Sequence, residues 1–345
     1  MQFIKSDINL DFIGKRKIAF IFSMTLIIIS IASLIYHGGP KLGIDFEGGT
    51  LIEVRFASPI NIADMKSGLR SVGLGSSSVQ DFSLESANEY LIRTDSDLVT
   101  AKDFSSNLKK ALDSSVGTKT EIRRLEMVGP QVGRDLREKA LMAMFYALLG
   151  ITFYISGRFE FKWLASGVMG LALILAVYLF KIIGFSIPLL IVSALLVTLI
   201  LFWVLDLRYA MGAIVALIHD VMITVGVFSV LGLEFTLPII AALLTIIGYS
   251  LNDTIIVFDR IRENLKKHAK QPLDFTINRS INETLSRTIL TSATTLFVVV
   301  TLYLLGGGII HDFAFALTIG IIVGTYSSLY VASPILLTWE LYKKK

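Results

Sequence analysis

The sequence has no cysteine among its 345 residues. This absence excludes disulfide bonds, thiolate metal sites and thiol catalysis, and it leaves the redox compartment undetermined. The glycine pair Gly48-Gly49 is not followed by a Lys-Ser or Lys-Thr pair, so a phosphate-binding loop is excluded as well. The sequence also lacks a nucleophile–base pattern and any signature of nucleic-acid binding. We therefore expect no enzyme activity, no cofactor, no metal and no bound nucleic acid.

Apolar residues make up 54% of the chain, and the mean hydropathy is +0.69. These values are far above those of a soluble domain and are typical of a polytopic membrane protein. At about twenty residues per crossing, the apolar stretches predict about eight membrane spans. The predicted spans are Ile18–Tyr36, Lys139–Ser156, Trp163–Phe180, Ile187–Leu205, Ala210–Leu231, Leu237–Phe258, Thr288–Leu305 and Phe313–Leu341.

The first span follows a short polar segment, residues 1–17, that ends in Lys15-Arg16-Lys17. A basic region before an apolar stretch is also typical of a cleaved signal peptide. The apolar region of a signal peptide is usually about 7–15 residues long, and no small-residue cleavage site ends Ile18–Tyr36. We favour an uncleaved first transmembrane helix at residues 18–36.

Residues 37–138 form the one sizeable polar region and predict a soluble domain. A glycine-rich turn leads into a strand at Thr50–Phe56, where apolar and polar residues alternate. The predicted elements that follow are a helix at Ile60–Val72, strands at Ser77–Ser83 and Tyr90–Thr94, a helix at Thr100–Val116 and a strand at Lys119–Met127. This order, strand–helix–strand–strand–helix–strand, is the ferredoxin-like pattern.

Basic residues in the loops predict the orientation of the chain. With a cytoplasmic N-terminus, the cytoplasmic loops hold the basic residues Arg158, Lys162, Arg208, Arg260–Arg279 and Lys343–Lys345. The opposite short loops hold only Lys181. The positive-inside rule then places both termini, residues 1–17 and 342–345, in the cytoplasm. We predict a polytopic α-helical membrane protein with one extracytoplasmic ferredoxin-like α+β domain, followed at 139–341 by a transmembrane bundle of about seven helices.

Asn252 and Asp253 lie inside an apolar stretch and are followed by Ile255–Phe258. A carboxylate at the centre of a span costs roughly 2.5–3.5 kcal/mol on insertion scales, so it indicates a functional site. The best candidate partner is Arg287, which lies at a similar depth at the head of the span Thr288–Leu305. An alternative stays open, in which Asp253 snorkels to the interface and Arg287 is a positive-inside anchor.

His219-Asp220 is a second polar pair inside an apolar span. Adjacent residues point about 100° apart on a helix, so we expect the two side chains not to serve one site equally. A metal site needs a third ligand, which this pattern lacks. A proton relay or a hydrogen bond between helices is the favoured interpretation. The predicted proton pathway therefore comprises Asp253, Arg287, Asn252, His219 and Asp220.

Small and hydroxyl-bearing residues near the end of the chain indicate helix contacts. Gly320 and Gly324 are a small-xxx-small pair, which favours close packing of two helices. The hydroxyl residues that follow Arg287 bond either across a helix interface or back to their own helix. They are Thr291, Ser292, Thr294 and Thr295.

The chain also contains an apparent internal repeat, because residues 158–196 resemble residues 208–244. A basic-aromatic loop, a glycine-rich span, a glycine exit and a span that begins near a proline recur in order. Repeats are common in transporter folds, whereas coincidental similarity between apolar spans is the alternative.

Five motifs, in order, resemble one known family. They are GIDFEGGT after the first span, VGPQVGRDLREKA before the second, ALIHDV, GYSLNDTIIVFDRIREN and INETLSRTILTSATT. Together they resemble the SecF family of bacterial protein-translocase subunits, which belongs to the resistance–nodulation–division superfamily. The resemblance implies six spans, so two of the predicted spans are extra, and RFEFKWLASG resembles an added copy.

The resemblance implies a function and partners. It implies an accessory subunit that works with SecD in the bacterial cytoplasmic (inner) membrane. Its extracytoplasmic domain would help to draw secreted polypeptide out of the SecYEG channel after the SecA motor has pushed it in. Asp253 and Arg287 match the family's intramembrane Asp and Arg, which implies a part in proton passage.

The sequence leaves open which partners the extra spans contact and which class of substrate the protein exports. The extra spans have SecD, YajC or lipid as candidate partners. An alternative function is that of a proton-driven small-molecule exporter subunit of the same superfamily. Such exporters usually need two extracytoplasmic domains and more spans in one chain.

Overall fold

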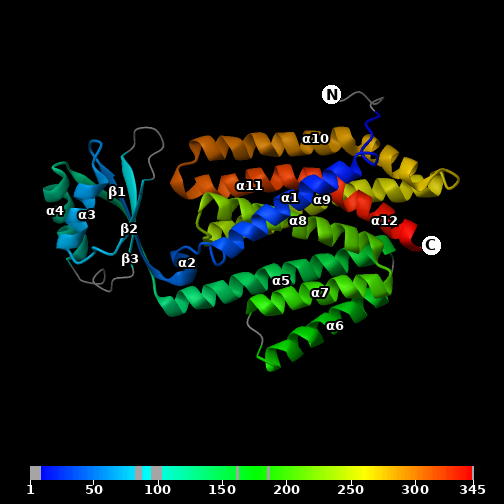
Figure 1. The fold of residues 1–345 in the computed structure, drawn as a ribbon, viewed down its shortest axis with the longest axis horizontal. Helices are drawn as coiled ribbons and strands as arrows, with labels where there is room; N and C mark the ends of the chain where they lie inside the picture. The colour runs from blue at the N-terminus through cyan, green and yellow to red at the C-terminus, as the bar shows by residue number, and fades with distance from the viewer. Residues whose placement is uncertain (1–8, 82–87, 95–102, 161–162, 185–186, 344–345) are drawn as a thin grey trace. The chain divides into compact units, whose positions relative to one another are not determined.

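The structure is a computed structural model that describes residues 9–81, 88–94, 103–160, 163–184 and 187–343. The chain divides into two compact units, and each has its own apolar core. The smaller unit is Leu42–Lys139, and the larger, helical unit combines Met1–Lys41 with Ala140–Lys345. Figure 1 shows both units along the chain.

The smaller unit is built on a four-stranded antiparallel sheet in the order β2-β3-β1-β4. Its elements are α2 (Ile44–Glu47), β1 (Gly49–Phe56), α3 (Ile62–Ser71), β2 (Ser78–Asp81), β3 (Glu89–Thr94), α4 (Phe104–Val116) and β4 (Thr120–Val128). The predicted order of strands and helices in this region is therefore found. The predicted start of the second helix, Thr100, lies outside the described residues, as does the predicted strand end at Ser83.

Alternation along the strands explains the core of the smaller unit. Ile52 and Val54 of β1 are fully buried, and the residues between them are only partly covered. Leu108 and Leu112 repeat every four residues on α4 and are also fully buried. Strand side chains at every second position and helix side chains at every fourth share one face, so this spacing brings them into one core.

Gly48, in the glycine pair before β1, is required by backbone geometry. Its φ of +84° lies in the region that favours glycine. A Cβ added there would lie only 2.9 Å from the Cα of Pro130, the first residue of α5 (Pro130–Glu160). Glycine at position 48 therefore allows the backbone just before β1 to lie in contact with the first residue of α5.

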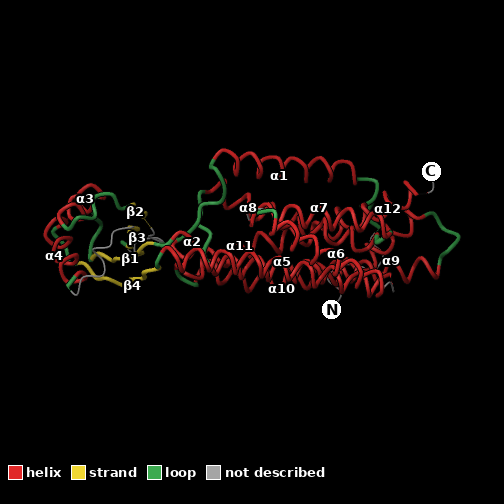
Figure 2. Tube along the Cα trace, turned by 90° about the horizontal axis from the view of Figure 1, so that it is seen from below, coloured by secondary structure: helices red, strands yellow, loops and turns green. Residues whose placement is uncertain are grey.

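The larger unit is a bundle of helices (Figures 1 and 2). Besides the greater part of α5, it contains α1 (Arg16–Tyr36), α6 (Trp163–Ile182), α7 (Ile187–Leu205), α8 (Arg208–Leu231), α9 (Leu237–Lys267), α10 (Leu273–Leu305), α11 (Gly308–Ser327) and α12 (Ser333–Lys343). Six stretches of helix in the described residues are long and apolar enough to cross a membrane. They are Arg16–Tyr36, Pro130–Phe159, Arg208–Leu231, Leu237–Lys267, Leu273–Leu305 and Ile310–Tyr342.

The other two predicted spans form helices α6 and α7. Their apolar parts are shorter, at Gly167–Phe180 and Leu189–Leu205. The number of membrane crossings supported by length and composition is therefore six, and crossing by α6 and α7 stays a prediction.

Helices α9 and α10 continue well beyond the apolar parts of their sequence. The polar region between the two predicted spans, residues 259–286, is almost entirely helical and turns only between Lys267 and Leu273. Ion pairs one turn apart support the polar helices, such as Lys267–Glu263 at 2.7 Å. Between the two helices, the buried Asn264 amide donates to Ser280 at 3.0 Å and to Glu283 at 2.8 Å.

Helix α11 packs closely against α9 at the two predicted small residues. A Cβ added at Gly320 would collide with the side chain of Ile246, and one added at Gly324 would lie 2.8 Å from Cβ of Ser250. The small-xxx-small prediction is thus met in this pair of helices. Directly after α11, the chain forms a short π-helical segment at Ser328–Ala332.

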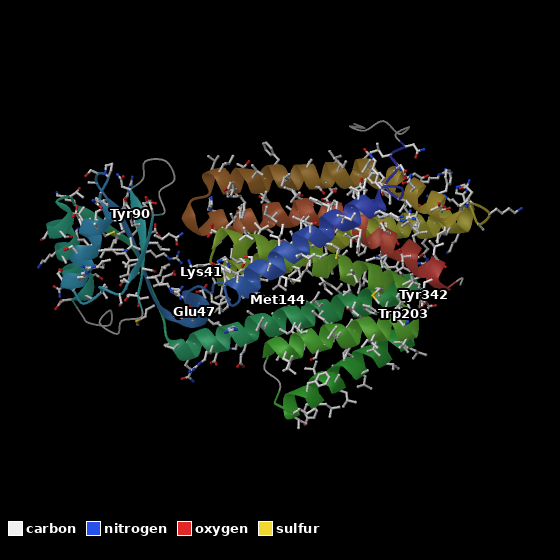
Figure 3. All side chains as sticks on the ribbon, viewed as in Figure 1. Lys41, Glu47, Tyr90, Met144, Trp203 and Tyr342 are labelled. Carbon is white, nitrogen blue, oxygen red and sulfur yellow. The ribbon has the colours of Figure 1, made fainter. Side chains whose placement is uncertain are left out.

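An aromatic cluster lies at the C-terminal ends of α7 and α12. The Trp203 ring lies 4.7 Å from the Trp339 ring and 5.2 Å from the Tyr342 ring, centroid to centroid. Figure 3 shows Trp203 and Tyr342 side by side at this end of the bundle. Tryptophan and tyrosine are enriched where a membrane meets water, so the cluster marks this end as interfacial.

Candidate functional site

Two carboxyl groups are buried inside the helical unit. Asp220 on α8 and Asp253 on α9 have exposed fractions of 0% and 1%. Both lie in helices that are apolar enough to cross a membrane. Burial of an ionisable group in such a helix is costly unless polar partners surround it, so the partners decide what each group can do.

Asp220 is held by three helices. On α8, the Nδ1 atom of His219 lies 2.9 Å from its Oδ1. Ser250 of α9 donates to its Oδ2 at 2.5 Å, and Ser327 of α11 donates to the same oxygen at 2.8 Å. Both carboxylate oxygens are therefore hydrogen-bonded, and the group links α8, α9 and α11.

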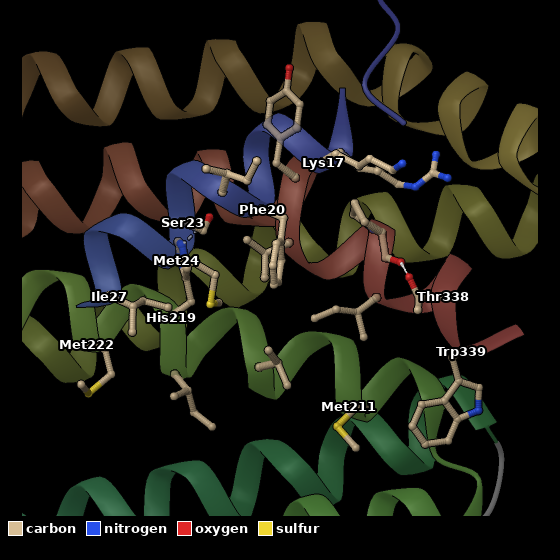
Figure 4. A pocket seen from close by; sticks show the side chains of 18 of the residues that line it. Lys17, Phe20, Ser23, Met24, Ile27, Met211, His219, Met222, Thr338 and Trp339 are labelled. Carbon is tan, nitrogen blue, oxygen red and sulfur yellow. Dashed lines mark hydrogen bonds between the residues drawn. The ribbon is translucent and has the colours of Figure 1, made fainter. Parts of the chain in front are cut away.

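His219 extends this network to α1. Its Nε2 atom lies 3.0 Å from the hydroxyl of Ser23, and Figure 4 shows the two side chains facing each other. The Tyr326 ring stacks on the imidazole at 6.0 Å, and its hydroxyl lies 3.1 Å from Ser23. Since one ring nitrogen faces a carboxylate and the other a hydroxyl, the imidazole can hold a proton on either side.

One prediction about this pair is wrong. His219 and Asp220 were expected to point to different surroundings, but their side chains bond to each other and share one buried network. The reason is that side-chain rotation brings the imidazole toward the carboxylate, even though adjacent Cβ atoms diverge on a helix.

Asp253 has a much poorer set of partners. Its Oδ2 accepts a long hydrogen bond from Ser292 of α10 at 3.3 Å. Its Oδ1 has no hydrogen-bond partner among the described residues. Ser292 in turn lies 2.7 Å from the hydroxyl of Thr325 on α11. The carboxyl group thus joins α9, α10 and α11 through one hydroxyl and has one oxygen free to gain or lose a proton.

The predicted ion pair between Asp253 and Arg287 is not formed in the structure. Arg287 has an exposed side chain on α10, and none of its nitrogens lies within ion-pair distance of Asp253. In the alternative, Asp253 snorkels to the interface and Arg287 is a positive-inside anchor. The buried Asp253 carboxyl group does not fit the first part, and the exposed Arg287 side chain is compatible with the second.

Asn252 does not belong to the buried site. Its side chain is exposed, whereas its neighbours Asp253 and Thr254 are buried. Thr254 instead lies 2.9 Å from the hydroxyl of Ser328, which donates to the Ser250 carbonyl at 3.4 Å. The Thr254–Ser328 contact links α9 to the π-helical segment that follows α11.

Hydroxyl residues are the part of the site that the sequence analysis missed. Ser292 was considered, and it alone among the four hydroxyl residues after Arg287 bonds to another helix. The other three bond back to their own helix: Thr291, Thr294 and Thr295. The residues not foreseen are Ser23, Ser250, Thr254, Thr325, Tyr326, Ser327 and Ser328. A usable signal is the pair Ser327-Ser328 in an apolar helix, where the π-helical segment begins.

Metal binding has no support in the described part of the chain. No group of three or more His, Cys, Asp or Glu side chains there is arranged to hold an ion. The buried site holds two carboxyl groups, an imidazole and a set of hydroxyls, which can bind protons and exchange hydrogen bonds.

Comparison with known protein families matches most of the chain. The profile described as protein export membrane protein SecD/SecF, C-terminal, matches residues 108–206 and again residues 197–342. A second profile, the SecD/SecF GG motif, matches residues 34–60, which include the glycine pair before β1.

Individual relatives match along nearly the full length. The protein translocase subunit SecF of Calditerrivibrio nitroreducens is 40% identical over 337 residues, which is 96% of this chain and 95% of the relative. That of Magnetococcus marinus is 42% identical over 344 residues, which is 99% of this chain and 95% of the relative.

A solved structure supports the same relationship. The chain is similar to SecDF, a translocon-associated membrane protein from Thermus thermophilus, with a TM-score of 0.72 and 30% identity. The similarity covers 98% of this chain and 40% of that longer protein. On the strength of these matches, the chain belongs to the SecF family of protein translocase subunits.

Proposed function

We propose that this SecF chain couples proton movement through its buried carboxyl groups to a late step of protein export. The observation that carries the proposal is Asp253, a buried carboxyl group with no cation and one oxygen without a hydrogen bond among the described residues. A buried carboxyl group without a cation is least costly when it is neutral. The arrangement therefore fits a protonated Asp253.

Loss of that proton would create a strong need for a new partner. An unpaired carboxylate in a low-dielectric site is costly, and Arg287 on the neighbouring helix α10 is the cation available. We infer that the deprotonated state draws Arg287 to Asp253, which changes the packing of α10 against α9 and α11. Proton binding and release would then switch the helices between two arrangements.

Asp220 and His219 would form the other part of the pathway. Their network contacts α1 at Ser23. Thr254 and Ser328, the chain neighbours of Asp253 and Ser327, lie 2.9 Å apart, hydroxyl to hydroxyl. Hydroxyl groups both donate and accept, so a proton can pass along them without a net change of charge. Asn252 has no part in this proposed route, because its side chain is exposed.

The smaller unit would be the moving part outside the cytoplasm. Its sheet order and its two helices support a ferredoxin-like domain. The basic loops support two cytoplasmic termini and an extracytoplasmic domain in the bacterial inner membrane. We infer SecD as the membrane partner, and SecYEG, SecA, YajC and the secreted polypeptide as further partners. The family assignment favours this role over small-molecule export, and the chain would act as an accessory subunit with protons as its coupling ion.

The test is precursor translocation into membrane vesicles, with and without a proton gradient. Asp253→Asn keeps the shape of the side chain and removes its proton binding, so we expect loss of the gradient-dependent step and at least a tenfold lower rate in the gradient. Arg287→Ala is expected to lose the same step. Asp259→Asn is the matched control, because this exposed carboxylate on the same helix bonds only to Arg158 among the described residues.

Two outcomes would contradict the proposal. Full gradient-dependent export by the Asp253→Asn chain would show that Asp253 is structural. Loss of export by Asp253→Asn and Asp259→Asn alike would show that the assay reports assembly of the helix rather than proton coupling.

A further inference from the structure

A long apolar cavity lies on the surface of the helical unit, separate from the surroundings of Asp253. Its volume is about 1060 Å³, and it lies between α1, α8 and α12, with Trp203 of α7 at one end. Figure 4 shows its wall, with Lys17 and Trp339 toward one end and Ile27 and Met222 farther along. On α1 it runs from Arg16 to Ile31, which is about 22 Å of helix and most of the thickness of a hydrocarbon core.

The lining of the cavity changes in character along its length. Arg16 and Lys17 are the charged residues that line it, and both are at the first turn of α1. Beside them are the indoles and the phenol of the interfacial aromatic cluster. Beyond this end the wall is almost wholly apolar, with Met24, Met211 and Met222 among its residues.

From this arrangement, we propose that the cavity binds an anionic phospholipid. One acyl chain would lie along the apolar wall between α1 and α8, and the phosphate would meet Arg16 and Lys17 at the interfacial end. Lysine and arginine near a membrane surface attract anionic headgroups, and unbranched methionine side chains adapt to a flexible chain.

Arg16 and Lys17, at the interfacial end of the cavity, are available to bind a phosphate. Two acids beside Trp339 do not line the cavity and have other partners. Asp206 accepts a hydrogen bond from the Trp339 indole at 2.9 Å, and Glu340 is paired with Arg208. Arg16 donates one bond to the Ile13 carbonyl at 2.9 Å, which holds its guanidinium close to the mouth.

A helix of another subunit fits this cavity less well than a lipid does. Helices that pack in a membrane usually meet at small residues, which let their backbones approach. The wall here consists mainly of large side chains, and no glycine lines it. The glycines of α8 face elsewhere, since Gly226 contacts Ser30 of α1 and Gly212 contacts Ala332 and Phe258.

Occupation by a lipid would have a consequence for the buried network. Ser23 and His219 both line the cavity, so the imidazole is separated from the surrounding membrane only by whatever fills this space. An acyl chain there would keep water away from the His219–Ser23 contact on that side. Proton exchange at His219 would then be confined to its hydrogen-bonded partners.

The test is lipid retention by the purified full-length chain, measured by native mass spectrometry with phosphatidylglycerol and with phosphatidylcholine. We expect preferential retention of phosphatidylglycerol, about fivefold weaker binding in Lys17→Gln and about thirtyfold weaker binding when Arg16→Gln is added. Lys15→Gln is the matched control, because it removes an equal charge from the same segment but does not line the cavity. The control is expected to bind like the unaltered chain.

A second pair of variants tests the acyl-chain position. Val215→Trp places a large ring inside the cavity and is expected to abolish retention, whereas Val230→Trp, exposed on the same helix, is expected to retain the lipid. Equal retention of both lipids, or no effect of Lys17→Gln and Val215→Trp, would overturn the proposal. So would a photocrosslinker at Val215 that attaches to another protein subunit in membranes rather than to lipid.

Discussion

Asp220 is the most fully hydrogen-bonded of the buried acids, and its surroundings identify which side chains hold the helices together. Its donors come from α8, α9 and α11, and each distance is 2.9 Å or shorter. A buried acceptor that loses a donor carries the cost of an unmade hydrogen bond, whereas a surface hydroxyl carries almost none. The contribution of this network can therefore be measured as a change in the free energy of unfolding.

Ser327→Ala removes one donor to the Oδ2 atom of Asp220. We expect it to lower the free energy of unfolding by about 1–3 kcal/mol, seen as a lower melting temperature of the purified protein in detergent. In an Asp220→Ala background the same change is expected to cost less than about 1 kcal/mol, because the acceptor is gone. Thr245→Ala is the control, since this exposed hydroxyl bonds, within the part of the chain that the structure describes, only to the Ala241 carbonyl of its own helix. Equal costs in both backgrounds would mean that Ser327 acts through packing alone.

Sequence reasoning located the buried titratable residues but not their partners. Asp253, His219 and Asp220 could be predicted because apolar residues surround each of them along the chain. The exposure of the Asn252 and Arg287 side chains could not be predicted, because burial depends on which helix covers each face. Ser250 and Ser327 were missed because a serine in a helix bonds equally well to its own backbone, and only packing decides.

At the scale of helices, the close packing predicted for Gly320 and Gly324 is found where α11 contacts α9. Gly320 and Gly324 lie on one face of α11, one turn apart, and each faces a side chain of α9. Packing in a membrane depends on such close approach, because lipid provides no hydrophobic drive between helices. Ser250 and Ser327 can donate to Asp220 only while α9 and α11 remain in this contact.

Gly320→Ala should therefore be destabilising despite the higher helix propensity of alanine. The new Cβ would collide with Ile246, and overpacking of this kind costs typically about 1–3 kcal/mol. We expect a lower melting temperature, which Ile246→Ala in the same chain should partly restore by making room.

Gly248→Ala on α9 is the matched control for that experiment. A Cβ at this position meets no atom within 4 Å, so the change is expected to be neutral or to stabilise the helix by up to about 1 kcal/mol. Equal effects of the two substitutions, or no restoration by Ile246→Ala, would show that α9 and α11 are not in the described contact.

The presence of a helix or strand was easier to predict than the residues at which it begins and ends. The strands of the smaller unit have clear alternation, and a helix was found at each predicted apolar run. Helix α5 nevertheless begins at Pro130, nine residues before the predicted start at Lys139. The extensions of α9 to Lys267 and of α10 from Leu273 were not foreseen. Their polar sequence has no apolar run, and they depend instead on ion pairs and on contacts such as Asn264–Glu283.

At the scale of the whole molecule, helices α6 and α7 form a pair inserted between α5 and α8. The end of α5 and the start of α8 lie beside each other, because the Phe159 ring stacks on the Tyr209 ring at 5.3 Å. Helices α6 and α7 are therefore inserted between two chain segments that lie beside each other. In each helix pair, a glycine with a positive φ follows the first helix. It is Gly184 in the pair α6–α7 and Gly232 in the pair α8–α9. The shared glycine position supports the predicted internal repeat of a helix pair.

This geometry makes a deletion testable. We expect a chain in which a short glycine-serine linker replaces residues 160–207 to insert with unchanged sidedness, because an even number of helices is removed. Apolar surface uncovered on α8 would face lipid rather than water, so the loss of packing carries no hydrophobic penalty. The deleted chain keeps both buried acids and should support gradient-dependent precursor translocation within about threefold of the full chain. A chain that lacks residues 208–258 instead loses Asp220 and Asp253 and should show none. Failure of the first deletion to translocate, with normal amounts of the chain in the membrane, would mean that α6 and α7 contribute a surface that export requires.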